Sequence, residues 1–281
     1  MKRAAIAIAV LGMWASSWAQ DKPAAQAAPS GQAATAPQGK RAPAAKTQPE
    51  FEAYKGAMQL TDGAAAEKAA EDFATKFPDS ELRAVLYKSA MQKYQSNTDK
   101  MLEMAQKTLA IDGDDPEALV TASQVLAERT RDTDLDKDQK LAEAKKDAER
   151  ALVTVDTDVP TSGFPPEKID QFKRFIRSEA YAILGTLASN AKNYSDAETN
   201  LRKSVEAFPE QVDPVAVLRL AIVLDMQNKY PDALKYANQA VDLTKAQPDS
   251  PAGKAARSEQ DRLTRLSSGS APGQSTAPQK N

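Results

Sequence analysis

Helical patterning runs through residues 51–266 almost without a break. Apolar residues recur there at spacings of three and four, and no stretch alternates β-branched or aromatic residues with polar ones, as a half-buried strand would. Three helix starts are explicit, because a capping side chain precedes a proline at Asp115-Pro116, Asp213-Pro214 and Ser250-Pro251. These signals predict an all-α fold.

The apolar spacing between the start signals predicts eleven helices, which form five pairs and a terminal helix. Ser195 and Glu198 have the spacing of a capping box at the start of one of them. The last helix has a polar outer face above Leu263 and Leu266 and is expected to cap the array. The expected ranges are 51–60, 64–77, 80–95, 98–111, 116–130, 138–155, 166–191, 194–208, 214–228, 231–245 and 251–266.

Two adjacent helix pairs share a sequence period. The first pair carries a bulky residue, Leu-Gly, Ala, a large apolar residue and Pro at the separations of the tetratricopeptide repeat pattern, and the second repeats the small residues. The stretch 166–246 therefore resembles a tetratricopeptide repeat (TPR) protein, of an exported bacterial type. The resemblance implies a right-handed superhelical solenoid of about five TPR-like helix pairs with a C-terminal capping helix, and the alternative is an ordinary helical bundle. The matching positions are Tyr181, Leu184, Gly185, Ala197, Leu201 and Pro209, then Leu220, Ala221, Ala233, Ala237 and Ala240.

Residues 1–19 have the organisation of a secretory signal peptide. Lys2 and Arg3 form a charged start, an apolar run follows, and the small residues Ser17 and Ala19 mark a cleavage site. The alternative is a retained membrane anchor, but the run is shorter than the roughly 20 residues that span a bilayer. We expect an exported protein, periplasmic or secreted, with no transmembrane segment in the mature chain.

Two low-complexity segments flank the helical region. Residues 20–50 are rich in Ala, Pro and Gln and predict a disordered tether, which Lys40, Arg41 and Lys46 make slightly basic. Residues 267–281 predict a disordered tail. The expected domain organisation is therefore a signal peptide (1–19), a tether (20–50), a helical repeat domain (51–266) and a tail (267–281).

The chain contains no His and no Cys. Imidazole bases, thiolate nucleophiles, Cys/His zinc sites and disulfides are therefore excluded. The 37 Lys and Arg nearly balance the 39 Asp and Glu, so no basic excess points to nucleic acid. This composition favours a non-enzymatic binding protein that uses no cofactor and does not bind nucleic acid.

The TPR resemblance implies that the first helix of each pair lines a concave groove, which binds an extended peptide or a partner helix. Leu218, Ile222 and Met226 would form an apolar strip on that surface. The alternative is that these three side chains pack against helix 166–191. The Lys/Asn clamp with which some family members hold a C-terminal carboxylate is not matched. The expected groove positions are Glu179, Ala182, Thr186, Ser189 and Asn190, then Val215, Leu218, Ile222, Asp225 and Met226.

An acidic stretch precedes helix 138–155. Asp132, Asp134 and Asp136, with Glu143 further along, have the ligand spacing of a calcium loop. Lys137, however, stands where such a loop needs glycine for its sharp turn. The alternative is a solvated loop in which Asp136 or Asp138 caps the following helix.

These observations predict a protein–protein interaction scaffold of the cell envelope, which binds a partner protein or peptide in the concave groove. An alternative within the binding class is a component of outer-membrane or secretion-apparatus assembly. The alternatives from other classes, a carboxylate-dependent hydrolase and a calcium-responsive module, have less support. Most Asp and Glu residues have basic neighbours one helical turn away, and nothing marks a buried acid pair.

Overall fold

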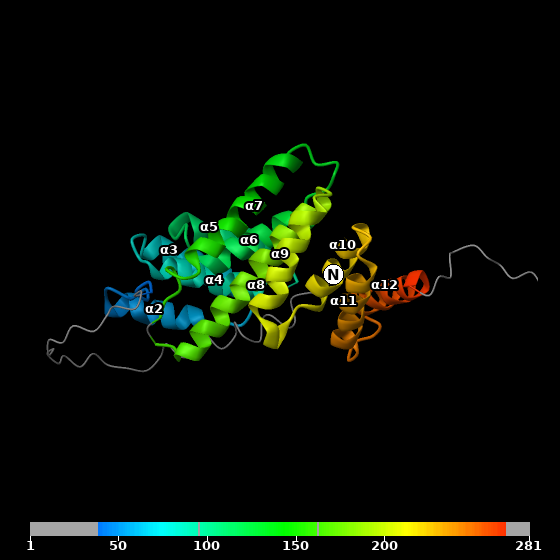
Figure 1. The fold of residues 1–281 in the computed structure, drawn as a ribbon. Helices are drawn as coiled ribbons and strands as arrows, with labels where there is room; N and C mark the ends of the chain where they lie inside the picture. Colours follow the sequence, from blue (N-terminus) through cyan, green and yellow to red (C-terminus); the bar gives the residue numbers. More distant parts are fainter. Residues whose placement is uncertain (1–38, 95, 162, 268–281) are drawn as a thin grey trace, which may run out of the picture. The chain divides into compact units, whose positions relative to one another are not determined.

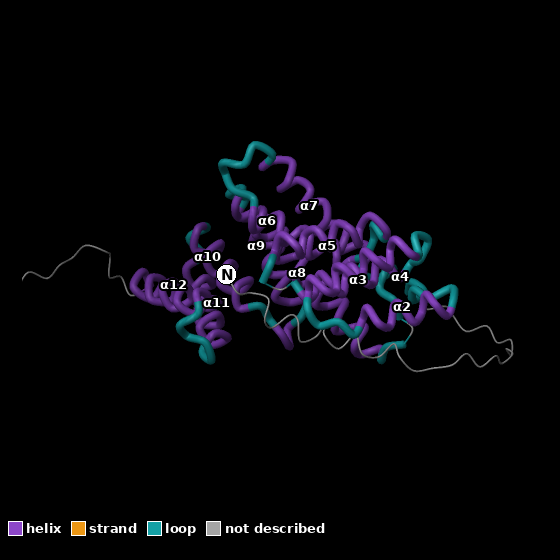
Figure 2. The backbone as a smooth tube through the Cα atoms, turned by 180° about the vertical axis from the view of Figure 1, so that it is seen from behind, coloured by secondary structure: helices purple, strands orange, loops and turns teal. Residues whose placement is uncertain are grey.

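The computed structural model describes residues 39–94, 96–161 and 163–267. Figures 1 and 2 show helices throughout these ranges, which contain eleven α-helices, one short 3₁₀-helix and no strand. The all-α prediction is confirmed for this part of the chain. The predicted signal peptide, the tether up to residue 38 and the tail from residue 268 lie outside the described residues.

Every helix begins and ends within three residues of its predicted bounds. The agreement is good because local signals set the helix ends: Asp115 accepts a hydrogen bond from the Ala118 amide at 2.9 Å, and Ser250 accepts one from the Gly253 amide at 3.1 Å. The helices are α2 (Gln48–Met58), α3 (Gly63–Lys76), α4 (Leu82–Lys93), α5 (Thr98–Ile111), α6 (Pro116–Arg129), α7 (Lys137–Thr154), α8 (Pro166–Asn190), α9 (Tyr194–Ala207), α10 (Pro214–Met226), α11 (Tyr230–Thr244) and α12 (Pro251–Ser267), with the 3₁₀-helix Pro209–Gln211 before α10.

The predicted capping box at Ser195 is wrong. Helix α9 begins at Tyr194, whereas a cap at Ser195 would place its first residue at 196; Asn193 caps it instead by accepting a hydrogen bond from the Asp196 amide at 3.3 Å. Lys192 adopts a positive φ of 61° directly before Asn193, so the chain turns there and Asn193, not Ser195, stands at the N-cap position.

A capping box lies instead at the start of α2, where none was predicted. The Thr47 hydroxyl accepts from the Glu50 amide at 3.3 Å, and the Glu50 carboxylate accepts from the Thr47 amide at 3.3 Å and the Lys46 amide at 2.6 Å. This box starts α2 three residues earlier than expected. The predicted tether therefore ends too late at residue 50: residues 48–50 are helical and residues 39–47 lead into them.

The chain forms two compact units, one ending at Ala180 and the other beginning at Tyr181, so α8 belongs to both. In the first unit, neighbouring helices from α3 to α7 pack in chain order. Their core alternates small with large side chains, which allows close helix approach. Fully or almost fully buried examples are Ala66, Ala70, Phe73, Leu86, Ala90, Met104 and Ala105.

The second unit packs α9 to α12 in the same consecutive manner, and α10 also contacts α12. Gly185 marks a close approach in this unit, because a Cβ built there would lie 2.6 Å from Cγ of Leu201. The consecutive packing in both units is that of a helical-repeat-like array. Among the described residues, no helix is both long and apolar enough to span a membrane.

Candidate functional site

The first unit contains a pocket of about 430 Å³. Its walls come from α2, α4, the last residue of α5, α6 and the first half of α8, together with the α5–α6 turn and the α7–α8 loop. Residues 40, 41 and 43, which precede α2, close one side. The pocket is not predictable from local sequence patterns, because its residues come from segments far apart in the chain.

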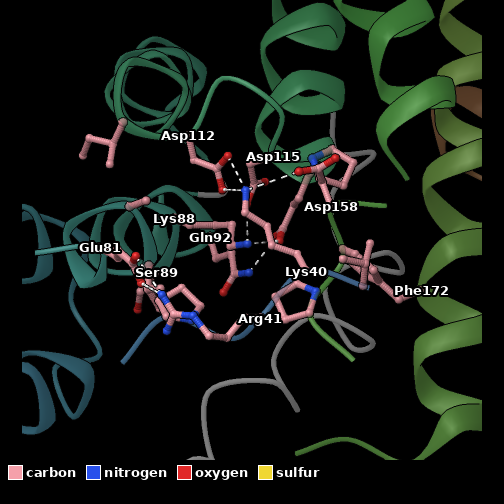
Figure 3. A pocket seen from close by; sticks show the side chains of 18 of the residues that line it. Lys40, Arg41, Glu81, Lys88, Ser89, Gln92, Asp112, Asp115, Asp158 and Phe172 are labelled. Carbon is pink, nitrogen blue, oxygen red and sulfur yellow. Dashed lines mark hydrogen bonds and ion pairs between the residues drawn. The ribbon is translucent and has the colours of Figure 1, made fainter. Parts of the chain in front are cut away.

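A stretch without regular secondary structure, residues 39–46, crosses this region; we call it the strap. The Lys40 ammonium donates to both carboxylate oxygens of Asp112, at 2.5 and 2.6 Å, and lies 3.4 Å from a carboxylate oxygen of Asp158. The Lys40 backbone amide donates to the Thr157 carbonyl at 2.9 Å. Figure 3 shows the Lys40 side chain directed at the two aspartates.

Further contacts hold the strap on either side of Lys40. Arg41 donates to both carboxylate oxygens of Glu81, at 2.8 and 2.7 Å, in the bidentate geometry that guanidinium groups favour. The Lys46 ammonium donates to the Asp79 carbonyl at 2.9 Å. Gly39 lies so close to the α7–α8 loop that a Cβ there would meet Cγ2 of Thr161 at 2.4 Å and the Val159 carbonyl oxygen at 2.8 Å. The strap is therefore held by close packing of its backbone as well as by ion pairs.

The polar side of the pocket is organised around Lys88 on α4. Its ammonium donates to Asp115 at 2.7 Å and lies 3.6 Å from Glu117, and Gln92 donates to the other oxygen of Glu117 at 2.7 Å. Burial alone would lower the pKa of Lys88, but the two carboxylates outweigh it and raise that pKa. Burial and the nearby Asp115 raise the pKa of Glu117, against the opposing effect of Lys88. Lys88 is thus a fixed cation that compensates two nearly buried acids.

The rest of the lining is largely apolar. Tyr54 and Met58 on α2, Val159 in the loop and Phe172 on α8 contribute to it, and Val159 and Phe172 are almost fully buried. Burial raises the pKa of Tyr54 to about 12, so its phenol is neutral at physiological pH. A pocket with apolar walls and a few placed polar groups suits ligand binding.

Acids outnumber bases in the lining. Three cationic side chains face five carboxyl groups, and two of the three cations belong to the strap. The remaining cation, Lys88, is committed to Asp115 and Glu117. The pocket wall contributed by the helices and loops therefore favours a positively charged occupant. The carboxyl groups are those of Glu81, Asp112, Asp115, Glu117 and Asp158.

The apolar strip expected on helix α10 is not exposed as predicted. Leu218 is only 6 % exposed and packs in a core cluster with Val217, Ala240 and Ala256. Ile222 is half-buried against that cluster, and only Met226, at 53 %, is exposed. The buried members of this cluster lie on α10, α11 and α12, with Val205 of α9 packed against them, and none of its residues lies on the predicted helix 166–191.

Two other expected groove residues have structural partners. Asp225 is 9 % exposed and forms an ion pair with Arg262 on α12. The Thr186 hydroxyl donates to the Ala182 carbonyl at 2.8 Å and accepts from Arg219 at 2.7 Å. Ala182 is also buried, Glu179, Ser189 and Val215 are half-buried, and Asn190 is exposed. Partner binding by this set stays a prediction.

The acidic stretch before α7 is a loop of local ion pairs. Asp132 pairs with Lys137 at 2.7 Å, and Asp136 pairs with Lys140 at 2.9 Å. Asp136 stands at the N-cap position but makes no capping hydrogen bond through its side chain. Within the described residues, no cluster of three or more acidic, His or Cys side chains is placed to hold a metal ion.

The comparisons with known proteins do not assign this chain to a family. No protein-family model matches the sequence, and no curated protein is significantly similar to it.

Proposed function

We propose that the protein is a non-enzymatic interaction scaffold of the TPR type, which binds an extended peptide segment of a partner protein in the pocket of its first unit. In this proposal the helices pair as α2/α3, α4/α5, α6/α7, α8/α9 and α10/α11, in a right-handed solenoid capped by α12. The pocket supports this scheme, because its helical walls come from α2, α4, α6 and α8, with α5 contributing only its last residue. These are the first helices of the proposed pairs, which line the groove in TPR proteins.

The observation that carries the proposal is the chain's own strap. Residues 39–46 cross the pocket without regular structure and are held by ion pairs and a main-chain hydrogen bond, as a bound peptide would be. A surface that already orders one extended segment requires little rearrangement to accept another. Such preorganisation reduces the free-energy cost of binding.

The proposed place of action is the cell envelope, on the basis of the signal-like residues 1–19. Expression in a bacterial host followed by separation of periplasmic and cytoplasmic fractions tests this directly. Intact-mass measurement of the periplasmic chain should give the mass that begins at Gln20. An unprocessed chain that stays with the cytoplasm would contradict export.

Site-specific photocrosslinking in the native envelope tests the binding function. A photoreactive amino acid replaces Val85, which lines the pocket, and in a matched control replaces Gln106, which is exposed on α5 outside it. We expect an adduct with another protein at position 85 and none at position 106. Mass spectrometry should place the adduct within one short segment of that protein.

A synthetic peptide of the captured segment then provides the second measurement. It should bind the purified full chain, and its binding should weaken at least tenfold when Asp112 and Asp158 are both replaced by Asn. The proposal fails if no protein is captured at position 85, if positions 85 and 106 capture the same proteins, or if the peptide binds the double variant as tightly as the unchanged chain.

A further inference from the structure

We propose that the strap is a built-in competitor for the pocket and that the external ligand is an extended basic segment which takes the place of Lys40 and Arg41. The inference rests on the proposed function and adds a regulatory device and a ligand chemistry to the same site.

The strap is held weakly enough to be displaced. The side chains of Lys40 and Asp112 are 33 % and 25 % exposed, and those of Arg41 and Glu81 are 68 % and 50 % exposed. The Arg41–Glu81 pair is exposed to solvent, so it contributes little free energy and is screened by salt, whereas the Lys40–Asp112 pair is only partly exposed. The contacts therefore define the position of the strap but contribute little free energy to holding it there.

The strap covers the pocket without filling it. Between its basic residues lie Ala42, Pro43, Ala44 and Ala45, and only small side chains are therefore available on that stretch. A volume of about 430 Å³ remains beside the strap, against the half-buried apolar side chains of Met58, Val85 and Ile111. An external segment with one large apolar side chain would bury surface that the strap leaves open, and this gives it an advantage over the resident segment.

The charges of the wall define the rest of the ligand. When the strap leaves, Asp112, Asp158 and Glu81 lose the cations that now pair with them. A replacement must bring positive charge to the same two places, since unpaired carboxylates at a partly buried wall are unfavourable. Two adjacent basic residues, as in Lys40-Arg41, meet this requirement.

The end of the strap is built as a hinge. The capping box of Thr47 and Glu50 starts α2 through contacts with Lys46 and Thr47, and it uses no group of residues 39–45. Release of residues 39–45 therefore leaves the α2 cap intact. Displacement costs the strap contacts only, and the pocket helices keep their fold.

Distance measurements between spin labels test whether the strap is seated as described. The chain has no Cys, so Ala44→Cys on the strap and Gln106→Cys on α5 give two unique attachment sites, both exposed. We expect one narrow distance distribution in the purified full chain. Gly39→Val should broaden it without any change in charge, because the new side chain would collide with the Val159 carbonyl.

A peptide with the sequence of residues 39–47 (GKRAPAAKT) tests competition. It should bind the Lys40→Ala/Arg41→Ala chain, and also the Gly39→Val chain, at least tenfold more tightly than the unchanged chain. A control peptide with Glu in place of the Lys and Arg that correspond to Lys40 and Arg41 should not bind. The matched control chain, Lys55→Ala/Lys254→Ala, loses two exposed positive charges away from the pocket and should behave as the unchanged chain.

The inference is overturned if Gly39→Val leaves the distance distribution narrow, or if the peptide binds the unchanged and strap-weakened chains equally. Both measurements use the purified protein and a defined peptide. They can give the expected results even when crosslinking in the envelope finds no partner. In that case the proposed function fails, but competition between the strap and a basic peptide is still supported. They can also fail while a partner is captured at position 85, in which case only the competition is excluded.

Discussion

The Lys40 ammonium donates to both carboxylate oxygens of Asp112 across 72 positions of sequence. Burial by itself would lower the pKa of Lys40, but Asp112 and Asp158 outweigh it and raise that pKa above the ordinary 10.5. The stability that this shift contributes is fully present below pH 10.5 and is lost only as the pH rises through the higher pKa of the folded state. Lys40 therefore keeps its charge at physiological pH, and displacement of the strap depends on a competing ligand or on salt.

Replacement of Lys88 by Ala should lower the free energy of unfolding by about 3 kcal/mol, because it leaves the nearly buried Asp115 and Glu117 without their shared cation. Chemical denaturation at neutral pH measures the loss. Lys55→Ala, at an exposed position on α2, should change stability by less than about 0.5 kcal/mol. Equal effects of the two substitutions would show that Lys88 does not compensate the acids.

Two glycines in helices should respond to alanine with opposite signs. A Cβ at Gly185 would lie 2.6 Å from Cγ and 3.2 Å from the backbone nitrogen of the fully buried Leu201, so Gly185→Ala should destabilise by about 1–3 kcal/mol. A Cβ at Gly56 would meet no atom within 4 Å, so Gly56→Ala should stabilise by about 0.5–1 kcal/mol through helix propensity. Thermal unfolding of both variants checks the pair, and a shift of the same sign in each would contradict the packing at Gly185.

The helices were predictable because their ends depend on neighbouring residues. Asp115 and Asp213 each cap a helix that begins with the next residue, a proline, and both caps are present as expected. The error at Ser195 has the same local origin, since Asn193 and Ser195 are both good capping residues and the turn at Lys192 decides between them. Local chemistry thus predicts where a helix lies to within a few residues.

The exposed face of α10 could not be predicted from periodicity. This helix is apolar on most sides, with Val217, Leu218, Leu220, Ala221, Val223 and Leu224 all buried. A sequence with so few polar positions does not indicate which side faces a partner and which faces α11 and α12. The expected strip of Leu218, Ile222 and Met226 was therefore placed on a side that is largely covered.

The pocket was missed for a different reason. Its acids follow α5 and α7, directly precede α4, or lie at the start of α6, and the strap that pairs with some of them belongs to a segment with the composition of a linker. The basic Lys40, Arg41 and Lys46 were the available signal, but composition cannot show that their counter-charges lie on the same chain. Only the packing of α2, α4 and α6 brings these groups together.

Arg262→Ala should loosen the terminal helix α12. Arg262 pairs with the 9 % exposed Asp225 on α10 and donates to both carboxylate oxygens of Glu259, at 3.1 and 3.0 Å. Its loss leaves Asp225 without that cation and should cost about 2 kcal/mol. Hydrogen exchange should show faster exchange in residues 251–267, and Lys254→Ala at an exposed position of the same helix should leave the rates unchanged. Unchanged protection in Arg262→Ala would mean that apolar packing alone holds α12.

Asp147 on α7 provides a pH-dependent prediction. Burial and, secondarily, the nearby Glu143 raise its pKa from 3.8 to about 6, against the opposing effects of Lys146 and Arg150. Because the pKa is higher in the folded state, the folded chain is favoured below pH 3.8 and loses that advantage as the pH rises through 6. Asp147→Asn should therefore raise stability at pH 7 by about 1 kcal/mol, a figure reduced for the partial exposure of the side chain, and change it little at pH 4.

Urea denaturation of the Asp147→Asn variant at pH 4, 5, 6 and 7 measures this difference. Glu149→Gln, at an exposed neighbouring position with a loose pair to Lys145 at 3.8 Å, serves as the control and should show little change across the series. A gain that is equal at pH 4 and pH 7 would point to a cause other than the charge of Asp147. A gain that appears between pH 4 and pH 7 in Asp147→Asn alone would establish that this carboxylate opposes folding when it ionises.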